Sequence, residues 1–394
     1  MTAKTTTYSF QALKTLRKFW LQVHLYIGLL AGAVFVLSGL AGSLSVFWPE
    51  IDTALNSSLK QVTYKSSAAE YRSLSQIVAA AKAVIPDQGK AYAFVFPAKP
   101  DEAFLITYSL PAKKMPEKSE WHQVFVNPYT ASVTGQRLTF DTSDPWRGSL
   151  MNFFVRFHYS LALGEAGKTL VGIVSLFLLF SVLTGLILWW PSPGKLRQAL
   201  TIKRSASIER FNFDLHKTVG FYFSIILLVV LFSGIYLVFT PYVTGLVKLF
   251  SPLQSEAAKL SSIFNAEQQP LKLGQVTAIT DQNFPDGEYK MIIFPQDGQG
   301  FYRIVKRAPA EINRTRPRRM LWLDQYSGKV LRKTDLQFDS AGDVFLQWLY
   351  PLHNGEAFGL LGRIIICITG LVPMILYVTG LIRWLQKRRA KSGR

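Results

Sequence analysis

Four of the five histidines in this 394-residue sequence occupy matching positions in two halves of the chain. His24 and His216 are each followed by a glycine one helical turn later, and His158 and His353 each precede a Thr-Gly-Leu triplet by the same interval. Each histidine lies at the edge of a long apolar run, where an ionisable side chain needs a partner. Imidazole is neutral near pH 7, so it can bind haem iron there without the cost of a buried charge. Because haem iron takes axial ligands in pairs, these histidines predict haem ligation.

Two other residue types near the histidines would suit a haem group. Small residues give clearance to a flat ring, and cations can pair with its propionates. The candidate small residues are Gly28, Gly164, Gly220 and Gly359, and the candidate cations are Arg156, Lys168, Lys217 and Arg363. Helix packing and lipid anchoring explain these residues equally well. Interfacial histidines can also be satisfied by water and headgroups. His122 has no counterpart in the second half and is interpreted as a surface residue.

Four apolar runs must position the repeated histidines. They are residues 21–48, 169–190, 219–243 and 364–385, and none has Asp, Glu or Lys at its centre. A bilayer-spanning helix needs about 20 apolar residues, so all four runs are long enough. The first run is too long for a cleavable signal peptide and is expected to remain as an anchor. We therefore predict an α-helical integral membrane protein with four transmembrane helices, arranged as a four-helix bundle.

The basic residues predict the topology. The N-terminal tail, the connection between the second and third runs, and the C-terminal tail carry 4, 5 and 6 Lys or Arg against two acidic residues, which is +13 of the formal net charge of +19. Basic residues mark cytoplasmic segments. The predicted order is a cytoplasmic tail (1–18), a helix (19–48), an outer domain (49–150), an entry segment with a helix (151–191), a cytoplasmic loop (192–212), a helix (213–243), an outer domain (244–350), an entry segment with a helix (351–385) and a cytoplasmic tail (386–394).

The sequence predicts two parallel repeats, each consisting of a helix, a domain and a second helix. Residues 158–190 align with 353–385 without a gap, whereas Ser38-Gly39 and Ser233-Gly234 match with an offset of three positions. Each outer segment predicts a helix followed by three strands, which indicates two α+β domains. The predicted helices are 74–84 and 273–282, and the predicted strands are 91–96, 104–108 and 122–126, then 289–294, 301–305 and 319–323.

Several function classes are disfavoured by composition. The basic charge is explained by topology and anionic lipid, so no nucleic-acid partner is expected. The single cysteine, Cys367, excludes an intrachain disulfide. The apolar cores lack the carboxylates and histidines that a metal-transport path would show. No nicotinamide- or flavin-binding motif is present, so an electron donor must bind separately or diffuse in the membrane.

At these residues the sequence resembles the PepSY-associated transmembrane family of bacterial inner-membrane proteins. The resemblance is carried by residues 20–28 (WLQVHLYIG), 214–220 (DLHKTVG), the two Thr-Gly-Leu triplets and residues 323–330 (LDQYSGKV). The first outer domain departs from it, with Ala131-Ser132 where a glycine is expected. The resemblance implies periplasmic PepSY-like domains, with both chain termini in the cytoplasm.

Within that family the layout is similar to that of ferrisiderophore reductases of the FoxB type. This similarity implies two b-type haems, with axial ligands among His24, His158, His216 and His353, and reduction of a ferric siderophore in the periplasm. The donor would be a quinol or a cytoplasmic reductase. Two alternatives stay open: a membrane b-type cytochrome that exchanges electrons with quinone or a protein partner, and a haem-free PepSY scaffold or regulator.

Depth in the membrane suggests pairing His24 with His216 inside and His158 with His353 outside. A straight helix from His158 to Leu186, at the depth of His24, would be about 42 Å long, too far for efficient electron exchange. Either Gly164 and Gly167 bend the outer segment back over the bundle, or the pairing differs.

Overall fold

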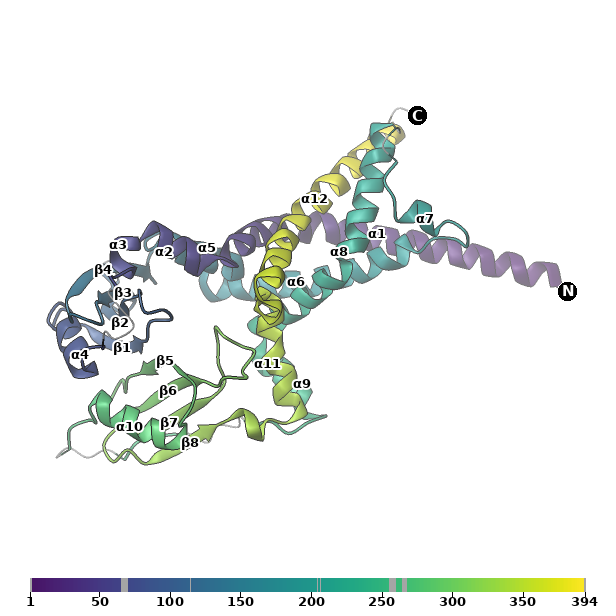
Figure 1. The fold of residues 1–394 in the computed structure, drawn as a ribbon. Helices are drawn as coiled ribbons and strands as arrows, with labels where there is room; N and C mark the ends of the chain where they lie inside the picture. Colours follow the sequence, from purple (N-terminus) through teal and green to yellow (C-terminus); the bar gives the residue numbers. More distant parts are fainter. Residues whose placement is uncertain are drawn as a thin grey trace. The chain divides into compact units, whose positions relative to one another are not determined.

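The structure is a computed structural model that describes residues 2–64, 70–113, 115–203, 205, 207–254, 260–263 and 268–392. The chain divides into two compact units (Figure 1). The helical unit comprises Met1–Phe47, Phe154–Val243 and Leu352–Arg394, and the sheet unit comprises Trp48–Phe153 and Thr244–Pro351. Residues 393–394 of the predicted C-terminal tail lie outside the described residues. Each unit is assembled from segments that are far apart in the sequence.

The helical unit contains the long apolar helices. They are α1 (Thr2–Ser45), α6 (Gly164–Trp189), α8 (Ile208–Val238) and α12 (Gly359–Ser392). Within the described residues, four segments are long and apolar enough to cross a membrane: Thr15–Ser45, Gly164–Trp189, Ile208–Val238 and Glu356–Ala390. They contain most of each predicted span, although the third helix ends at Val238 and a short helix, α9 (Thr240–Lys248), follows it.

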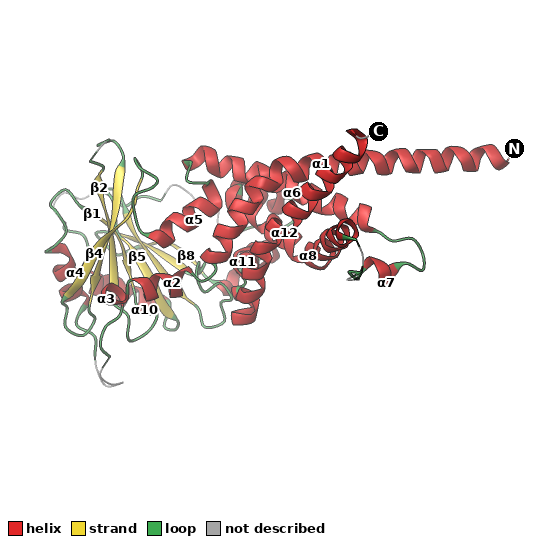
Figure 2. Ribbon diagram, turned by 90° about the horizontal axis from the view of Figure 1, so that it is seen from above, coloured by secondary structure: helices red, strands yellow, loops and turns green. Residues whose placement is uncertain are grey.

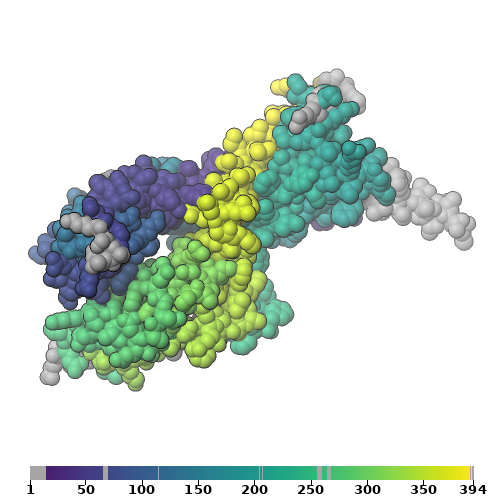
Figure 3. Space-filling view, viewed as in Figure 1, coloured from purple at the N-terminus to yellow at the C-terminus, as the bar shows by residue number. Residues whose placement is uncertain are grey.

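These helices form a four-helix bundle, in which they contact one another in the cyclic order α1, α6, α8, α12. Ala31, Leu178 and Leu231 form the centre of an apolar cluster between α1, α6 and α8. Only 22–33% of the most apolar window of each span is buried, so most of each surface is free to meet lipid. Figure 3 shows part of α12 (yellow) at the surface of the helical unit. Leu360 and Leu361, near the start of α12, are exposed.

Two short helices precede α6 and α12. The first is α5 (Leu150–Ser160), and the second is α11 (Ala341–Asn354), which is followed by a 3-10 turn, η2 (Glu356–Phe358). Leu161, Ala162 and Gly164 have φ values of 52°, 59° and 63°, so the chain turns sharply between α5 and α6. An ideal Cβ on Gly167 would meet the Ser160 carbonyl, which shows how closely the turn packs.

The second repeat turns in the same way. Gly355 and Gly359 have φ values of 83° and 60°, and a Cβ on Gly362 would meet the Gly355 carbonyl. The interval from Gly355 to Gly362 equals that from Ser160 to Gly167. The bend that the sequence offered as one of two options is therefore present in both halves.

The sheet unit contains one eight-stranded antiparallel sheet (Figure 2). Its strands are β1 (Lys90–Val95), β2 (Phe104–Pro111), β3 (Ser119–Val126), β4 (Val133–Asp141), β5 (Glu288–Ile293), β6 (Phe301–Arg307), β7 (Met320–Asp324) and β8 (Val330–Thr334). The order is β4-β3-β2-β1-β5-β6-β7-β8. Each half contributes four consecutive strands, and β1 pairs with β5 at the middle of the sheet.

The core of the sheet unit is shared by both halves. Helices α4 (Leu74–Lys82) and α10 (Leu273–Asn283) contribute Ile77 and Val276, which pack in one buried cluster with Phe94, Ile106 and Ile304 of the strands. The remaining short elements are α2 (Trp48–Leu55), α3 (Ser57–Lys60), α7 (Leu196–Ala199) in the helical unit, and η1 (Leu336–Phe338).

The structure differs from the sequence-based expectation in two respects. Three strands were predicted in each outer segment, but β4 and β8 add a fourth to each. The two segments also do not form separate sheets, because the β1–β5 pairing, with Phe94 opposite Ile292, joins them. That pairing is a contact between distant parts of the chain, and the local alternation of apolar residues carries no information about it.

Candidate functional site

The first histidine pair lies inside the bundle. His24 is on α1 and His216 is on α8, helices that are opposite each other in the cyclic order. Their ring centroids are 6.3 Å apart, and the ring planes are nearly perpendicular, at 86°. The structure thus brings together the two histidines that their depth suggested, which we call the inner pair.

The second pair comes from the short helices. His158 is on the last turn of α5, and His353 is on the last turn of α11. Their ring centroids are 6.0 Å apart, and their planes meet at 50°. We call these two residues the outer pair. Each of the four histidines is only partly buried, although each contacts a neighbouring helix, so each keeps surface for a further ligand.

Every histidine is held by its Nδ1 atom. Nδ1 donates to a backbone carbonyl in three cases: His24 to Ser181 (2.9 Å), His158 to Ser38 (2.8 Å) and His353 to Val230 (3.1 Å). In the fourth case the Thr379 hydroxyl oxygen is 2.8 Å from Nδ1 of His216. These bonds place the proton on Nδ1 and leave Nε2 as the nitrogen that could bind a metal, which is how metal-bound histidines are usually oriented.

Each histidine ring also packs on a glycine of a neighbouring helix. The pairs, with the distance from an ideal glycine Cβ to the nearest ring atom, are His24 with Gly185 (3.0 Å), His158 with Gly42 (2.7 Å), His216 with Gly380 (3.4 Å) and His353 with Gly234 (3.3 Å). Larger side chains there would push the rings out of place. Sequence reasoning treated the other three glycines as repeat markers and did not single out Gly42.

The glycine contacts also correct the repeat alignment. Gly39 was matched with Gly234, which left an offset of three positions. The structural equivalent of Gly234 is Gly42, because each follows the histidine on its own helix by the same interval and each packs on an outer histidine. With this match, the first and third helices align without a gap.

The arrangement fits a haem iron held between two imidazoles. At a metal–imidazole distance of about 2 Å, two rings on opposite sides of one metal have centroids about 6 Å apart. The observed separations of 6.3 Å and 6.0 Å meet this requirement. Cβ atoms added to Gly28 would meet nothing within 4 Å, and at Gly220 the nearest atom is 3.6 Å away, so both positions also leave room. Gly164 and Gly359 instead form the turns.

The two pairs are separated by equal lengths of two different helices. Ser38, which holds His158, follows His24 on α1 by the same interval as Val230, which holds His353, follows His216 on α8. A stretch of α-helix of this length spans about 21 Å. The straight-helix length estimated from the sequence does not apply, because the chain turns back at residues 161–164.

The four candidate propionate cations have different surroundings. Lys217 forms an ion pair with the buried Asp214 at 3.0 Å and donates to the Gln198 carbonyl, so it is already engaged. Lys168 pairs with Glu165 at 3.4 Å.

Arg363 donates to the Val46 carbonyl at 2.8 Å and lies 4.5 Å from the centroid of the Phe47 ring. Arg156 is partly buried on α5, one half-turn before His158. A role for any of the four beside a haem group stays a prediction.

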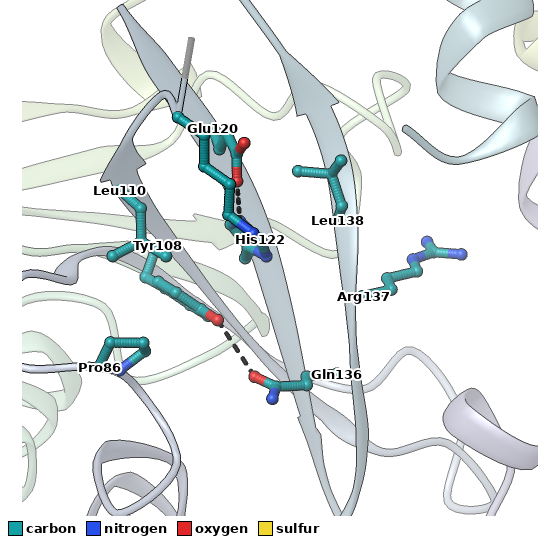
Figure 4. A pocket seen from close by; sticks show the side chains of 9 residues that line it. Pro86, Tyr108, Leu110, Glu120, His122, Gln136, Arg137 and Leu138 are labelled. Carbon is teal, nitrogen blue, oxygen red and sulfur yellow. Dashed lines mark hydrogen bonds and ion pairs between the residues drawn. The ribbon is translucent and has the colours of Figure 1, made fainter. Parts of the chain in front are cut away.

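His122 lies in the sheet unit and lines a hollow of about 390 Å³ (Figure 4). It is half-buried rather than fully on the surface: its ring stacks on Tyr108, and Nε2 is 3.2 Å from the Glu120 carboxylate. Burial opposes ionisation of Glu120, but hydrogen bonds from Arg147 and His122 hold the pKa of that carboxyl below its usual range. Within the described residues, no three His, Cys, Asp or Glu side chains gather as a metal site.

The sequence model of the family described as the PepSY-associated TM region matches residues 21–387. The chain belongs to this family. The match includes most or all of each of the four apolar helices and both segments of the sheet unit, so it extends over nearly the whole chain. No curated protein matches the sequence at a significant level.

Proposed function

We propose that this protein is a di-haem b reductase of the bacterial inner membrane, which passes electrons to ferric siderophores on the periplasmic side so that iron is released. The observation that supports the proposal is the geometry of the two histidine pairs. Each pair has the separation, the Nδ1 hydrogen bonds and the glycine clearance that two axial haem ligands require. Haem iron, when bound, supplies one-electron chemistry that the side chains themselves lack.

The residues of the bundle hold this chemistry in place. His24 and His216 would bind one haem, and His158 and His353 the other, each through Nε2. Ala31 and Leu178 lie in the apolar cluster of the bundle, which keeps its interior dry. Ala31 lies midway along α1 between His24 and Ser38, so this layer separates the inner pair from the outer pair.

The reaction consumes one electron for each iron. A siderophore binds Fe(III) far more tightly than Fe(II), so reduction loosens the metal and the free siderophore is returned. The electron comes from a donor outside the chain, a quinol or a cytoplasmic reductase. We assign the cytoplasmic side to the inner pair, because the basic connection between α6 and α8 lies at that end of the helices.

The first test is the absorption spectrum of the full chain purified in detergent. We expect a Soret band and about two haems per chain. His24→Ala and His158→Ala should each lose one haem, whereas His122→Ala, a histidine of the sheet unit, should keep both. A wild-type chain without a Soret band would remove both redox functions and leave the scaffold or regulator.

The second test separates the two redox functions. The protein is reduced with dithionite, the excess is removed, and a ferric hydroxamate or ferric catecholate chelate is added under argon. A reductase reoxidises its haem while Fe(II) appears in a ferrous-specific chelator assay. Haem that stays reduced with both chelates would count against reductase activity and favour a cytochrome that serves quinone or a protein partner.

A further inference from the structure

The hydrogen bonds behind the four histidines are not equivalent. Three histidines donate from Nδ1 to a backbone carbonyl, whereas the close partner of His216 is the side-chain hydroxyl of Thr379, at 2.8 Å. A carbonyl position is fixed by the helix, but a hydroxyl depends on the residue type. The Leu376 carbonyl also interacts with the His216 ring, so the hydroxyl is the part of this anchor that a single side-chain substitution can remove.

The Thr379 hydroxyl is committed as an acceptor. Its own proton is donated to the carbonyl of Ile375, at 2.6 Å, so its oxygen presents a lone pair to the imidazole N–H. Thr379 is 5% exposed, and a polar group buried among apolar helices needs such partners. Donation to Ile375 also polarises the hydroxyl and strengthens the bond that it accepts.

The other half of the chain supplies a matched control. Thr184 is the repeat equivalent of Thr379, since both begin a Thr-Gly-Leu triplet at the same interval after an outer histidine. Thr184 donates to the Ser181 carbonyl at 2.9 Å, just as Thr379 donates to Ile375 and more distantly to Leu376. However, His24 already donates to the Ser181 carbonyl at 2.9 Å, and Thr184 is farther away, at 3.3 Å. Thr184 is therefore redundant where Thr379 is the close partner.

We propose that Thr379 is a positioning residue that orients His216 and raises its basicity, and so makes the inner haem site electronically dependent on one hydroxyl. This inference rests on the proposed function, because it assigns His216 to a haem. A hydrogen-bond acceptor on Nδ1 makes an imidazole a stronger donor to the metal, and loss of such a partner typically weakens metal binding about 10–100-fold. Without the hydroxyl, the oxidised haem of the inner site loses more stabilisation than the reduced haem.

The test compares Thr379→Val, Thr184→Val and Thr379→Ser in the full chain. Valine keeps the shape of threonine but removes the hydroxyl, and serine restores it. The readouts are haem per chain, a potentiometric titration of both haems and the low-spin electron paramagnetic resonance spectrum. We expect T379V to raise the midpoint potential of one haem and shift its largest g value, or to lose that haem. T184V should match wild type, and T379S should recover it.

The outcomes separate this inference from the function on which it rests. A haem-loaded T379V chain indistinguishable from wild type, or equal shifts in T379V and T184V, would overturn the inference and leave the proposed function standing. A wild-type chain that binds no haem would overturn both. If T379V fails to fold, Thr379→Ala takes its place, because it also removes the hydroxyl. A wild-type potential for both haems in that variant would overturn the inference, since a merely structural role of the hydroxyl would not by itself move the potential of a single haem.

Discussion

At the scale of single residues, buried polar groups mark the places where the sequence departs from a simple apolar bundle. Ser38, Ser181, Ser233 and the two repeat-related threonines are all buried within long apolar helices. Most of them form a hydrogen bond with Nδ1 of a histidine, or supply the backbone carbonyl that accepts one from it. A buried hydroxyl costs free energy unless it is satisfied, so their position beside the imidazoles indicates that ring orientation is what they provide.

The carboxyl of Asp339 predicts an unusual pH dependence in the sheet unit. The pKa of Asp339 is raised to about 6, mainly by burial. The Arg318 guanidinium opposes this shift, and the nearby Asp343 and Glu311 carboxylates add to it. Between pH 3.8, the ordinary pKa of an aspartate, and about pH 6, the folded chain binds more protons than the unfolded chain. The free energy of unfolding therefore falls as pH rises through this window.

Asp339→Asn should remove this pH-dependent loss of stability, because the amide is always neutral. In the wild-type chain Gln254 Nε2 donates to Oδ1 of Asp339 at 3.0 Å, and the amide oxygen of asparagine can accept the same hydrogen bond. We expect the variant to be more stable than wild type above pH 6 and to show no difference near pH 4. Thermal unfolding of the full chain can be followed by the β-sheet band in infrared spectra, which reports on the sheet unit. Asp87→Asn, on an exposed turn, is the control, and an equal effect in both variants would refute the assignment.

At the scale of elements, close approach of helices depends on glycine. An added Cβ at Gly39 would lie 2.6 Å from the Gly370 carbonyl, so α1 and α12 pack backbone to backbone at this point. Glycines also allow the histidine rings to pack directly on neighbouring helices, because a ring can lie against a helix only where no side chain intervenes. In each half, residues with positive φ values form the bend between the short helix and the long helix that follows it, α5 and α6 in the first half and α11 and α12 in the second.

Substitution of these glycines should have graded effects. Gly42→Ala places a Cβ 2.7 Å from Nδ1 of His158, a rigid ring already held by a hydrogen bond, whereas Gly234→Ala leaves 3.3 Å to the ring of His353. We expect G42A to cost about 1–3 kcal/mol of stability, as overpacking usually does, and to reduce outer-site haem more than G234A.

Gly245→Ala, on α9, is the control, since its Cβ would meet nothing within 4 Å. Haem per chain and the melting temperature in detergent measure all three variants. If G245A were as disruptive as G42A, ring contact would not be the cause.

At the scale of the whole molecule, each half of the chain contributes to both units. Each half supplies two long helices to the bundle and four strands to the sheet. The inner pair takes one histidine from each half, and so does the outer pair. Neither half alone contains a complete pair, so any chemistry that needs two imidazoles requires both halves to fold together.

The predicted topology can be tested by cysteine labelling. In a Cys367→Ser background, Ser132→Cys lies on an exposed turn of the sheet unit, and Ser192→Cys lies in the exposed connection between α6 and α8. An impermeant maleimide should label the first in intact spheroplasts and the second only after the membrane is opened. The reverse pattern would invert the topology, and labelling of both in intact spheroplasts would contradict the single membrane crossing, α6, predicted between the two sites.

The sequence by itself determined the four apolar helices, the repeated histidines and most of the strands, because length, hydropathy and alternation are local properties of the chain. It also suggested which histidines pair, through their depth. Only the tertiary structure decided that Gly42 rather than Gly39 seats His158, that the chain turns back at residues 161–164, and that β1 joins β5 in one sheet. These features are contacts between residues far apart in the sequence. Their energies depend on packing and on hydrogen bonds that form only when both partners are in place.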